Sequence, residues 1–325
     1  MGVFNILCRH RLEGVNCQEF LLFDLKSAIN DTLANTFIEC GLSQDLSVIR
    51  TESSVADGTS IYAVGRGSKR AILLVSPAKF PEVVSQDQAK AAAMRNYLGE
   101  ELGSVILNPL AQGHILNRSY ALMPFRRTYS DNRLFWALQK HQMKRQVIEW
   151  LQAVNGRYSV IADSASNREQ FIRPLQYLKT MPAADRNIRV AASTALDRLL
   201  KQKFQPYFVP MHNDLWKGNF LQRTRGDGRS KASYRFFIVD WRGSRINGFP
   251  IYDLVRVSLS YKLTPSELNA AIIRATAALE CDPVDALSYV TVALGEIALR
   301  MDQFPLNQFL QLARDCIMEV KRAKI

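Results

Sequence analysis

Cys-x-x-Cys pairs, long apolar runs and the uninterrupted apolar stretch typical of a signal peptide are all missing from this sequence of 325 residues. Its five cysteines are scattered and none belongs to a Cys-x-x-Cys motif, so a zinc site or a redox dithiol is not expected. No stretch of about 18 apolar residues could span a bilayer. Charged residues near the N-terminus, such as Arg9 and Glu13, interrupt the apolar segment that a signal peptide requires. We therefore expect a protein of the reducing cytoplasm.

Acidic residues are outnumbered by basic ones. The chain has 42 lysines and arginines against 30 aspartates and glutamates, a formal net charge of +12. This excess favours an anionic partner: a nucleotide, a phosphorylated sugar, an acidic lipid surface or a nucleic acid. Simple solubility is the alternative explanation. Basic residues cluster at 126–127, 140–145, 223–229 and 321–324.

The first part of the chain is rich in short β-prone runs. A helical segment is predicted over 17–50. Two strands, at 60–64 and 70–75, flank the turn residues 65–68 and predict a hairpin. A helix at 86–101 and strands at 104–107 and 119–123 follow. We expect a helical extension at 1–50 and a small β-rich lobe at 51–125.

The second part is mainly helical. Apolar residues at three-to-four spacing predict three helices and a helical tail, with a strand-and-loop block at 207–250 between them. The predicted helices cover 134–154, 168–181, 185–202 and much of 264–324. Asp131-Asn132 is a candidate N-cap for the first, and 223–233 is a candidate exposed hairpin loop. We expect a larger helical lobe at 126–325, joined to the small lobe near 123–127.

One segment combines the residue types that phosphoryl transfer needs. It contains His212, Asp214 and Asn219 in a short loop, and Asp240 follows at the end of an apolar strand. Phosphoryl transfer requires a carboxylate that orients the attacking hydroxyl and hard oxygen ligands that hold magnesium against the phosphates. The alternative is an ordinary loop histidine, turn-forming residues and a strand end.

The order His-x-Asp-x-x-x-x-Asn followed by a strand-terminal aspartate resembles the aminoglycoside phosphotransferase and choline kinase families of the protein-kinase-like superfamily. The resemblance implies a two-lobed α+β fold, with a small antiparallel β-rich lobe and a larger helical lobe. It implies ATP and Mg²⁺ as cofactors, Asp214 as catalytic base, and Asn219 and Asp240 as metal ligands. His212 would pack the loop against the strand that ends at Asp240. Asp253, in the segment 248–254, would be a buried acceptor that braces the loop.

The small lobe departs from the family pattern. Leu74 stands where the family has a strand-three lysine that pairs with the α- and β-phosphates, and the partner glutamate is not evident near Gln88 or Lys90. Lys217, Lys79 and Lys69 are candidates for the missing cation, with Lys217 first and Lys79 second.

Two further nucleotide contacts are expected in the small lobe. Gly58 is a candidate for a phosphate-covering loop, because its backbone N–H could approach phosphates; an ordinary turn is the alternative. Met123 would lie in the connector whose backbone binds adenine. A buried strand without a ligand is the alternative at that position.

Three functions are consistent with these patterns. The first is an ATP-dependent kinase that phosphorylates a hydroxyl of a small molecule or sugar. The basic clusters favour an anionic acceptor, such as a sugar of a phosphorylated glycolipid or of lipopolysaccharide core at the inner membrane surface. The second is a catalytically inactive kinase-like scaffold. The third is nucleic-acid binding, which is disfavoured because no aromatic stacking platform accompanies the basic clusters.

Overall fold

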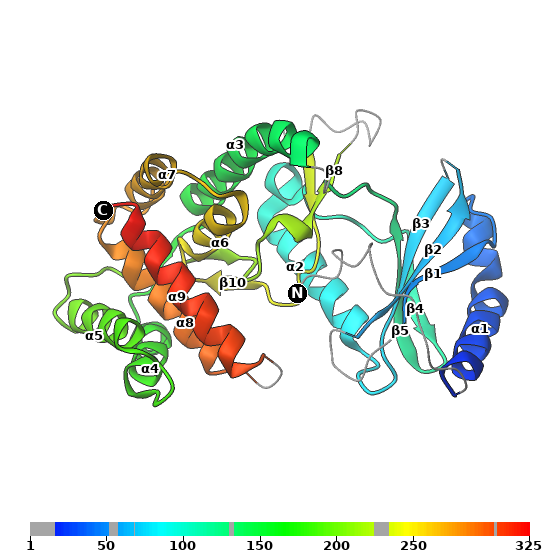
Figure 1. Cartoon of the computed structure of the whole chain (residues 1–325), viewed down its shortest axis with the longest axis horizontal. Helices are drawn as coiled ribbons and strands as arrows, with labels where there is room; N and C mark the ends of the chain where they lie inside the picture. The colour runs from blue at the N-terminus through cyan, green and yellow to red at the C-terminus, as the bar shows by residue number, and fades with distance from the viewer. Residues whose placement is uncertain (1–16, 52–57, 68, 130–132, 224–233, 302–303) are drawn as a thin grey trace.

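The structure is a computed structural model that describes residues 17–51, 58–67, 69–129, 133–223, 234–301 and 304–325. Figure 1 shows a sheet and its covering helix at one end and a larger, mostly helical part at the other. The two-lobed α+β fold expected from the sequence is confirmed. The candidate N-cap at 131–132 lies outside the described residues, as does the expected loop beyond Arg223 up to residue 233.

The small lobe is built on a five-stranded antiparallel sheet. Its strand order is β1-β2-β3-β5-β4. The strands are β1 (Leu46–Arg50), β2 (Ser60–Arg66), β3 (Lys69–Val75), β4 (Ala111–Ile115) and β5 (Arg118–Pro124). The predicted hairpin is therefore present as β2 and β3.

Two predictions in this lobe are wrong. Residues 46–50 form a strand, whereas the helical segment was expected to continue to residue 50. The strand predicted at 104–107 is not part of the sheet, and β4 begins at Ala111 instead. Ile106 forms a single parallel bridge to Ile238 of the large lobe. The apolar run at 104–107 thus contacts the large lobe. Local periodicity cannot distinguish such a contact segment from a strand of the sheet, because both are short and apolar.

Helix α1 (Cys17–Glu39) covers one face of the sheet (Figure 1). Its buried residues Leu25, Ile29, Leu33 and Phe37 repeat every fourth position, so they form one apolar stripe. They pack in one cluster with sheet residues that include Tyr62. The first helix therefore shares a hydrophobic core with the small lobe. The domain boundaries at residues 50 and 125 stay a prediction.

Helix α2 (Val83–Gly103) connects the two lobes. Its later turns contribute Met94, Leu98 and Leu102 to the core of the large lobe. The indole Nε1–H of Trp150 donates to the carbonyl of Leu102 at 3.0 Å. The earlier turns of α2 face the gap between the lobes, so side chains on them are available to a site there.

Seven helices make up most of the described large lobe. They are α3 (Arg133–Tyr158), α4 (Ala165–Thr180), α5 (Arg186–Leu200), α6 (Tyr252–Tyr261), α7 (Pro265–Ala277), α8 (Asp285–Ala298) and α9 (Leu306–Arg322). The helices predicted from periodicity are all present. Thr264 and Glu267 form the reciprocal hydrogen bonds of a capping box at the start of α7. Within the described chain, no helix is both long and apolar enough to cross a membrane.

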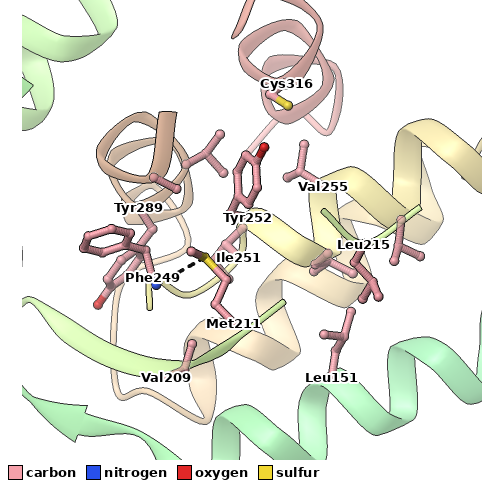
Figure 2. Close-up of a cluster of buried hydrophobic side chains, with 14 of the residues drawn as sticks. Leu151, Val209, Met211, Leu215, Phe249, Ile251, Tyr252, Val255, Tyr289 and Cys316 are labelled. Carbon is pink, nitrogen blue, oxygen red and sulfur yellow. Dashed lines mark hydrogen bonds between the residues drawn. The ribbon is translucent and has the colours of Figure 1, made fainter. Parts of the chain in front are cut away.

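Short strands carry the candidate site. They are β6 (Val160–Ile161), β7 (Tyr207–Met211), β8 (Phe220–Gln222), β9 (Phe236–Ile238) and β10 (Arg245–Gly248), and the 3₁₀ turn η1 (Lys217–Asn219) precedes β8. Figure 2 shows the apolar cluster beneath them, with Met211 against Phe249. A Cβ on Gly248 would lie 2.2 Å from the Cβ of Met211. Only glycine therefore lets β10 approach β7 this closely.

Candidate active site

A cavity lies between the two lobes, where the candidate site residues were expected. Leu74, Met123 and Thr59 line it from the small lobe, and Asp240 lines it from the large lobe. Its remaining lining residues are Ile72, Val83, Val84, Asp87, Gln88, Ala91, Leu107, Pro124, Arg126, Leu221, Ile238, Val239, Trp241 and Arg242. The wall is mostly apolar with a few polar groups at one end, which is typical of a site for a small molecule or cofactor.

Helix α6 holds the loop at 212–219 through one face. Asp253 accepts the backbone N–H groups of His212 at 2.6 Å and of Asn213 at 3.0 Å. It is 5% exposed, so the geometry expected for this residue is present. Seven positions later in the helix, the Oγ of Ser260 accepts the N–H of Lys217 at 2.7 Å. Positions i and i+7 lie on the same side of a helix, so one face of α6 accepts hydrogen bonds from the loop both at its start and near its end.

Asp214 is paired with a cation that the motif did not predict. The Nη2 of Arg256, on the same face of α6 at position i+3 from Asp253, donates to Oδ1 of Asp214 at 2.7 Å. The Arg256 side chain is 18% exposed, whereas that of Asp214 is 44% exposed. Asp214 is therefore accessible to an acceptor while one of its oxygens is fixed. The sequence signal for Arg256 is its position three residues after Asp253, on the same face of the helix. This spacing does not indicate that Asp214 is its partner.

His212 joins the loop to the strand that leads to Asp240. Its Nε2–H donates to the carbonyl of Val239 at 3.1 Å, and its Nδ1 accepts the N–H of Asp214 at 3.3 Å. Burial lowers the pKa of His212 to about 4, so the ring is neutral and can donate and accept in this way. The ring also packs edge-on against Trp241, with centroids 4.6 Å apart. The structure therefore places His212 between the loop and this strand, and its supporting role stays a prediction.

Asn219 and Asp240 lie at the same end of the β8–β9 hairpin. Phe220 pairs with Ile238, and the N–H of Val239 donates to the carbonyl of Asn219 at 3.0 Å. Asn219 donates through Nδ2 to the carbonyl of Asp214 at 2.8 Å, while its buried Oδ1 has no hydrogen-bond partner in the structure. An unpaired buried oxygen is costly and is a suitable ligand for a hard cation.

The electrostatics of Asp240 also fit a cation. Burial and the nearby charges of Asp87 and Asp214 raise the pKa of Asp240 to about 7. Its φ of 66° is left-handed, a costly conformation that is concentrated at functional sites. Gathered carboxylates beside the amide oxygen of Asn219 match the oxygen ligands of Mg²⁺, which also takes phosphate oxygens and waters. The described residues contain no group of three or more His, Cys, Asp or Glu side chains that could hold a metal alone.

Asp87 on α2 is a functional candidate that sequence reasoning missed. It lines the cavity one residue before Gln88, where a partner glutamate was sought. Burial raises its pKa to about 6, and the N–H groups of Arg242 and Trp241 oppose this rise. The Nζ of the nearby Lys90 donates to the carbonyl of Arg242 at 2.5 Å. Helix α2 is therefore tied to the backbone that follows Asp240.

The strand-three lysine is absent from the cavity as well as from the motif. Leu74 pairs with Ile61 and Ala121 and presents an apolar side chain to the cavity. Lys217, the first candidate for the replacement, does not line the cavity; its Nζ lies 5.7 Å from the ring centroid of Trp136. Lys79 is exposed beside Phe80 and does not line it either.

Arg50, at the end of β1, is a cation near the cavity that sequence reasoning missed. Its Nε and Nη2 donate to the carbonyl of Thr59 at 3.0 and 2.8 Å, and its charge lowers the pKa of Asp240. Thr59 lines the cavity and follows Gly58, the candidate phosphate-loop glycine, which is buried. The end of β1 therefore brings a positive charge toward the acidic end of the cavity.

Comparison with known proteins establishes the fold. Neither the family models nor the curated proteins match this sequence. Choline kinase LicA from Streptococcus pneumoniae is similar in structure, with a TM-score of 0.50 and 12% identity over 92% of this chain and 99% of the kinase. This chain has the protein-kinase-like fold.

Other solved structures of this fold are also similar to the chain. A choline/ethanolamine kinase family protein from Mesorhizobium loti has a TM-score of 0.47 and 13% identity, covering 93% of this chain and 94% of that protein. APH(2")-IIia, solved with GDP and kanamycin, has a TM-score of 0.49 and 12% identity, covering 90% of this chain and 100% of its own.

Proposed function

We propose that this protein is an ATP-dependent phosphotransferase that moves the γ-phosphoryl group to a hydroxyl of a small molecule or sugar. One observation carries the proposal: Asp214 and Asn219 lie beside Asp240, which lines the cavity between the lobes, and the buried amide oxygen of Asn219 is unpaired. Phosphoryl transfer depends on positioning and charge stabilisation more than on covalent steps by the protein. The protein-kinase-like fold supports this assignment.

Each residue has a distinct role in the proposed reaction. Asp214 orients the acceptor hydroxyl and accepts its proton, while Arg256 holds the carboxylate in place. Asn219 and Asp240 would hold magnesium, which supplies positive charge to the β- and γ-phosphates when bound. His212 and Asp253 fix the loop. The apolar wall around Met123 and Leu74 would enclose the nucleotide base and ribose.

A cation is still needed beside the phosphates, and we assign it to Arg50 in place of the strand-three lysine. Neither Arg50 nor the two candidate lysines line the cavity, but Arg50 donates to the carbonyl of Thr59 in its wall and its charge lowers the pKa of Asp240. Arg50 therefore replaces Lys217 and Lys79 as the proposed cation. Gly58 next to Thr59 stays the candidate for a backbone contact to phosphate. A guanidinium offers several donors at fixed angles and suits phosphate oxygens.

The acceptor and the cellular site are further proposals. A sugar of a phosphorylated glycolipid or of lipopolysaccharide core, phosphorylated in the cytoplasm at the inner membrane surface, fits the net charge of +12. A catalytically inactive scaffold is the second candidate, and Leu74 in the cavity is the observation that favours it.

Measurements of nucleotide binding and of phosphate transfer together distinguish the kinase from the scaffold. ATP with Mg²⁺ should raise the melting temperature of the wild-type protein, because a ligand stabilises by RT ln(1 + [L]/Kd). Transfer of labelled phosphate from ATP to an acceptor mixture should then depend on Asp214, with Asp214→Asn as the matched control. Nucleotide binding without transfer to any acceptor would favour the scaffold. An unchanged melting temperature would contradict the kinase proposal.

A further inference from the structure

Three lysines lie around the place where the loop that follows Asp214 meets helix α3 and the end of helix α6. Lys217 follows Asp214 in the same loop, and its Nζ lies over the ring of Trp136 on α3. Trp136 packs against Tyr261 on α6, with ring centroids 5.3 Å apart. These contacts bring the loop, α3 and the end of α6 together at one place.

Lys140 and Lys262 complete this group. Lys140 lies four residues after Trp136, which places it one turn further along the same face of α3. Lys262 follows Tyr261 and ends α6. We refer to Lys140, Lys217 and Lys262 as the lysine cluster.

Among the described residues, the positive charges of the lysine cluster are only partly balanced by carboxylates. No described carboxylate forms an ion pair with any of its three members. Lys144, one turn further along α3, is paired with Glu267 of α7. Burial lowers the pKa of Lys140, and the charges of Lys144 and Lys262 lower it further, while the charge of Glu267 acts in the opposite direction and does not restore the ordinary value. Like charges held this close are unfavourable unless an anion joins them, so the arrangement is typical of a binding site for an anionic group.

One aromatic ring in this region, that of Trp136, is already covered by a cation. A quaternary ammonium acceptor would need the open face of a ring such as Trp136, but the ammonium of Lys217 lies over that ring. A cationic acceptor would therefore meet repulsion beside Asp214. An acceptor with a negative group would instead be attracted by these lysines, one of which, Lys217, lies in the same loop as Asp214.

We infer that the acceptor of the proposed kinase carries a phosphate group in addition to the hydroxyl that is phosphorylated, and that the lysine cluster binds this phosphate. The inference rests on the proposed function and narrows its acceptor to phosphorylated sugars or polyols. The phosphate can belong to a soluble sugar phosphate or to the headgroup of a glycolipid. Both offer the same dianionic group to Lys140, Lys217 and Lys262.

Matched acceptor pairs test this inference in the full-length protein with ATP and Mg²⁺. Each pair is one sugar with and without a phosphate ester, offered in solution and, in a second arm, as a phosphorylated or unphosphorylated glycolipid in neutral vesicles. We expect kcat/KM at least about tenfold higher for the phosphorylated member, because hydrogen bonds between charged groups are the stronger ones. The arm in which the phosphorylated acceptor has the higher kcat/KM shows whether the phosphate belongs to a soluble sugar or to a glycolipid. Preference for the neutral member or for a cationic amino alcohol would overturn the inference.

A double variant locates the binding group. Lys140→Met with Lys262→Met should raise KM for the phosphorylated acceptor about tenfold or more, with kcat and the KM for ATP little changed. The control is Lys179→Met with Lys321→Met, which removes the same charge from exposed positions on α4 and α9. Equal KM values in the two double variants would overturn the inference.

The result can be separated from a failure of the proposed function. Calorimetric titration with glucose 6-phosphate, at saturating nucleotide analogue, measures phosphate binding without turnover. Weaker binding by the Lys140/Lys262 variant than by the control supports the inference even if that sugar is not a substrate. Equal binding, or none to the wild-type protein, contradicts it. A protein that ATP and Mg²⁺ do not stabilise contradicts the proposed function instead.

Discussion

Replacing Asp253 by alanine should uncouple the catalytic loop from helix α6. The carboxylate accepts two backbone N–H groups, from His212 and Asn213, and it is almost fully buried. Alanine removes both acceptor oxygens. Each donor left unpaired costs about 1–3 kcal/mol. Asn213 also has a left-handed φ of 74°, a conformation that these hydrogen bonds help to maintain.

An opposing term reduces the net effect. Burial raises the pKa of Asp253 to about 7, so keeping its carboxylate ionised in the fold has a cost that alanine removes. We therefore expect the free energy of unfolding to fall by about 1–3 kcal/mol, which is less than the summed cost of two unpaired donors. The rate of phosphoryl transfer should also fall, even under conditions in which the variant is fully folded. The reason is that Asp214 directly follows Asn213, whose backbone N–H loses its acceptor.

Urea unfolding followed by circular dichroism measures this change. Asp253→Asn is the isosteric comparison: its amide retains one acceptor and turns a donor toward the other N–H, so it should also destabilise. The control is Asp315→Ala, which removes an exposed carboxylate on α9. If Asp253→Ala unfolds at the same urea concentration as the control, with an equal slope, Asp253 does not brace the loop and the reasoning is refuted.

Three further predictions concern the remaining site residues. Asp214→Asn should lower kcat by about 10²–10⁴-fold while ATP still raises the melting temperature; unchanged kcat would exclude Asp214 as the base. Arg256→Met should lower kcat and shift its pH profile, and Arg256→Lys should restore part of both; identical profiles in the wild type and the two variants would exclude a positioning role. Asp240 is protonated in the fold up to about pH 7 but only to about 3.8 when unfolded, so the folded protein binds the extra proton. The stabilisation of the fold by protonated Asp240 is fully present below pH 3.8 and is lost as the pH rises through 7. Without Mg²⁺, Asp240→Asn should therefore weaken the fall in melting temperature between pH 5 and 8, and it should abolish the response to Mg²⁺ with ATP; melting curves that match the wild type would contradict this.

The sequence alone identified the large-lobe part of the candidate site. Asp214, Asn219, Asp240 and Asp253 lie within one continuous segment, and their identities and spacing are local properties. The large-lobe helices were also predicted, because an amphipathic helix records its buried face as a three-to-four periodicity. The family resemblance also placed Leu74 where a strand-three lysine was expected.

Tertiary structure decided which charges meet. Arg50 approaches Asp240 from the far end of the sheet, and Asp87 reaches the backbone after Asp240 from α2. Arg256 meets Asp214 because α6 packs under the loop. None of these pairs has a fixed spacing along the chain, since each depends on how separate elements pack. Lys217 shows the same limit: its position beside Asp214 suggested a cation for the cleft, but the packing of α3 directs its ammonium to Trp136.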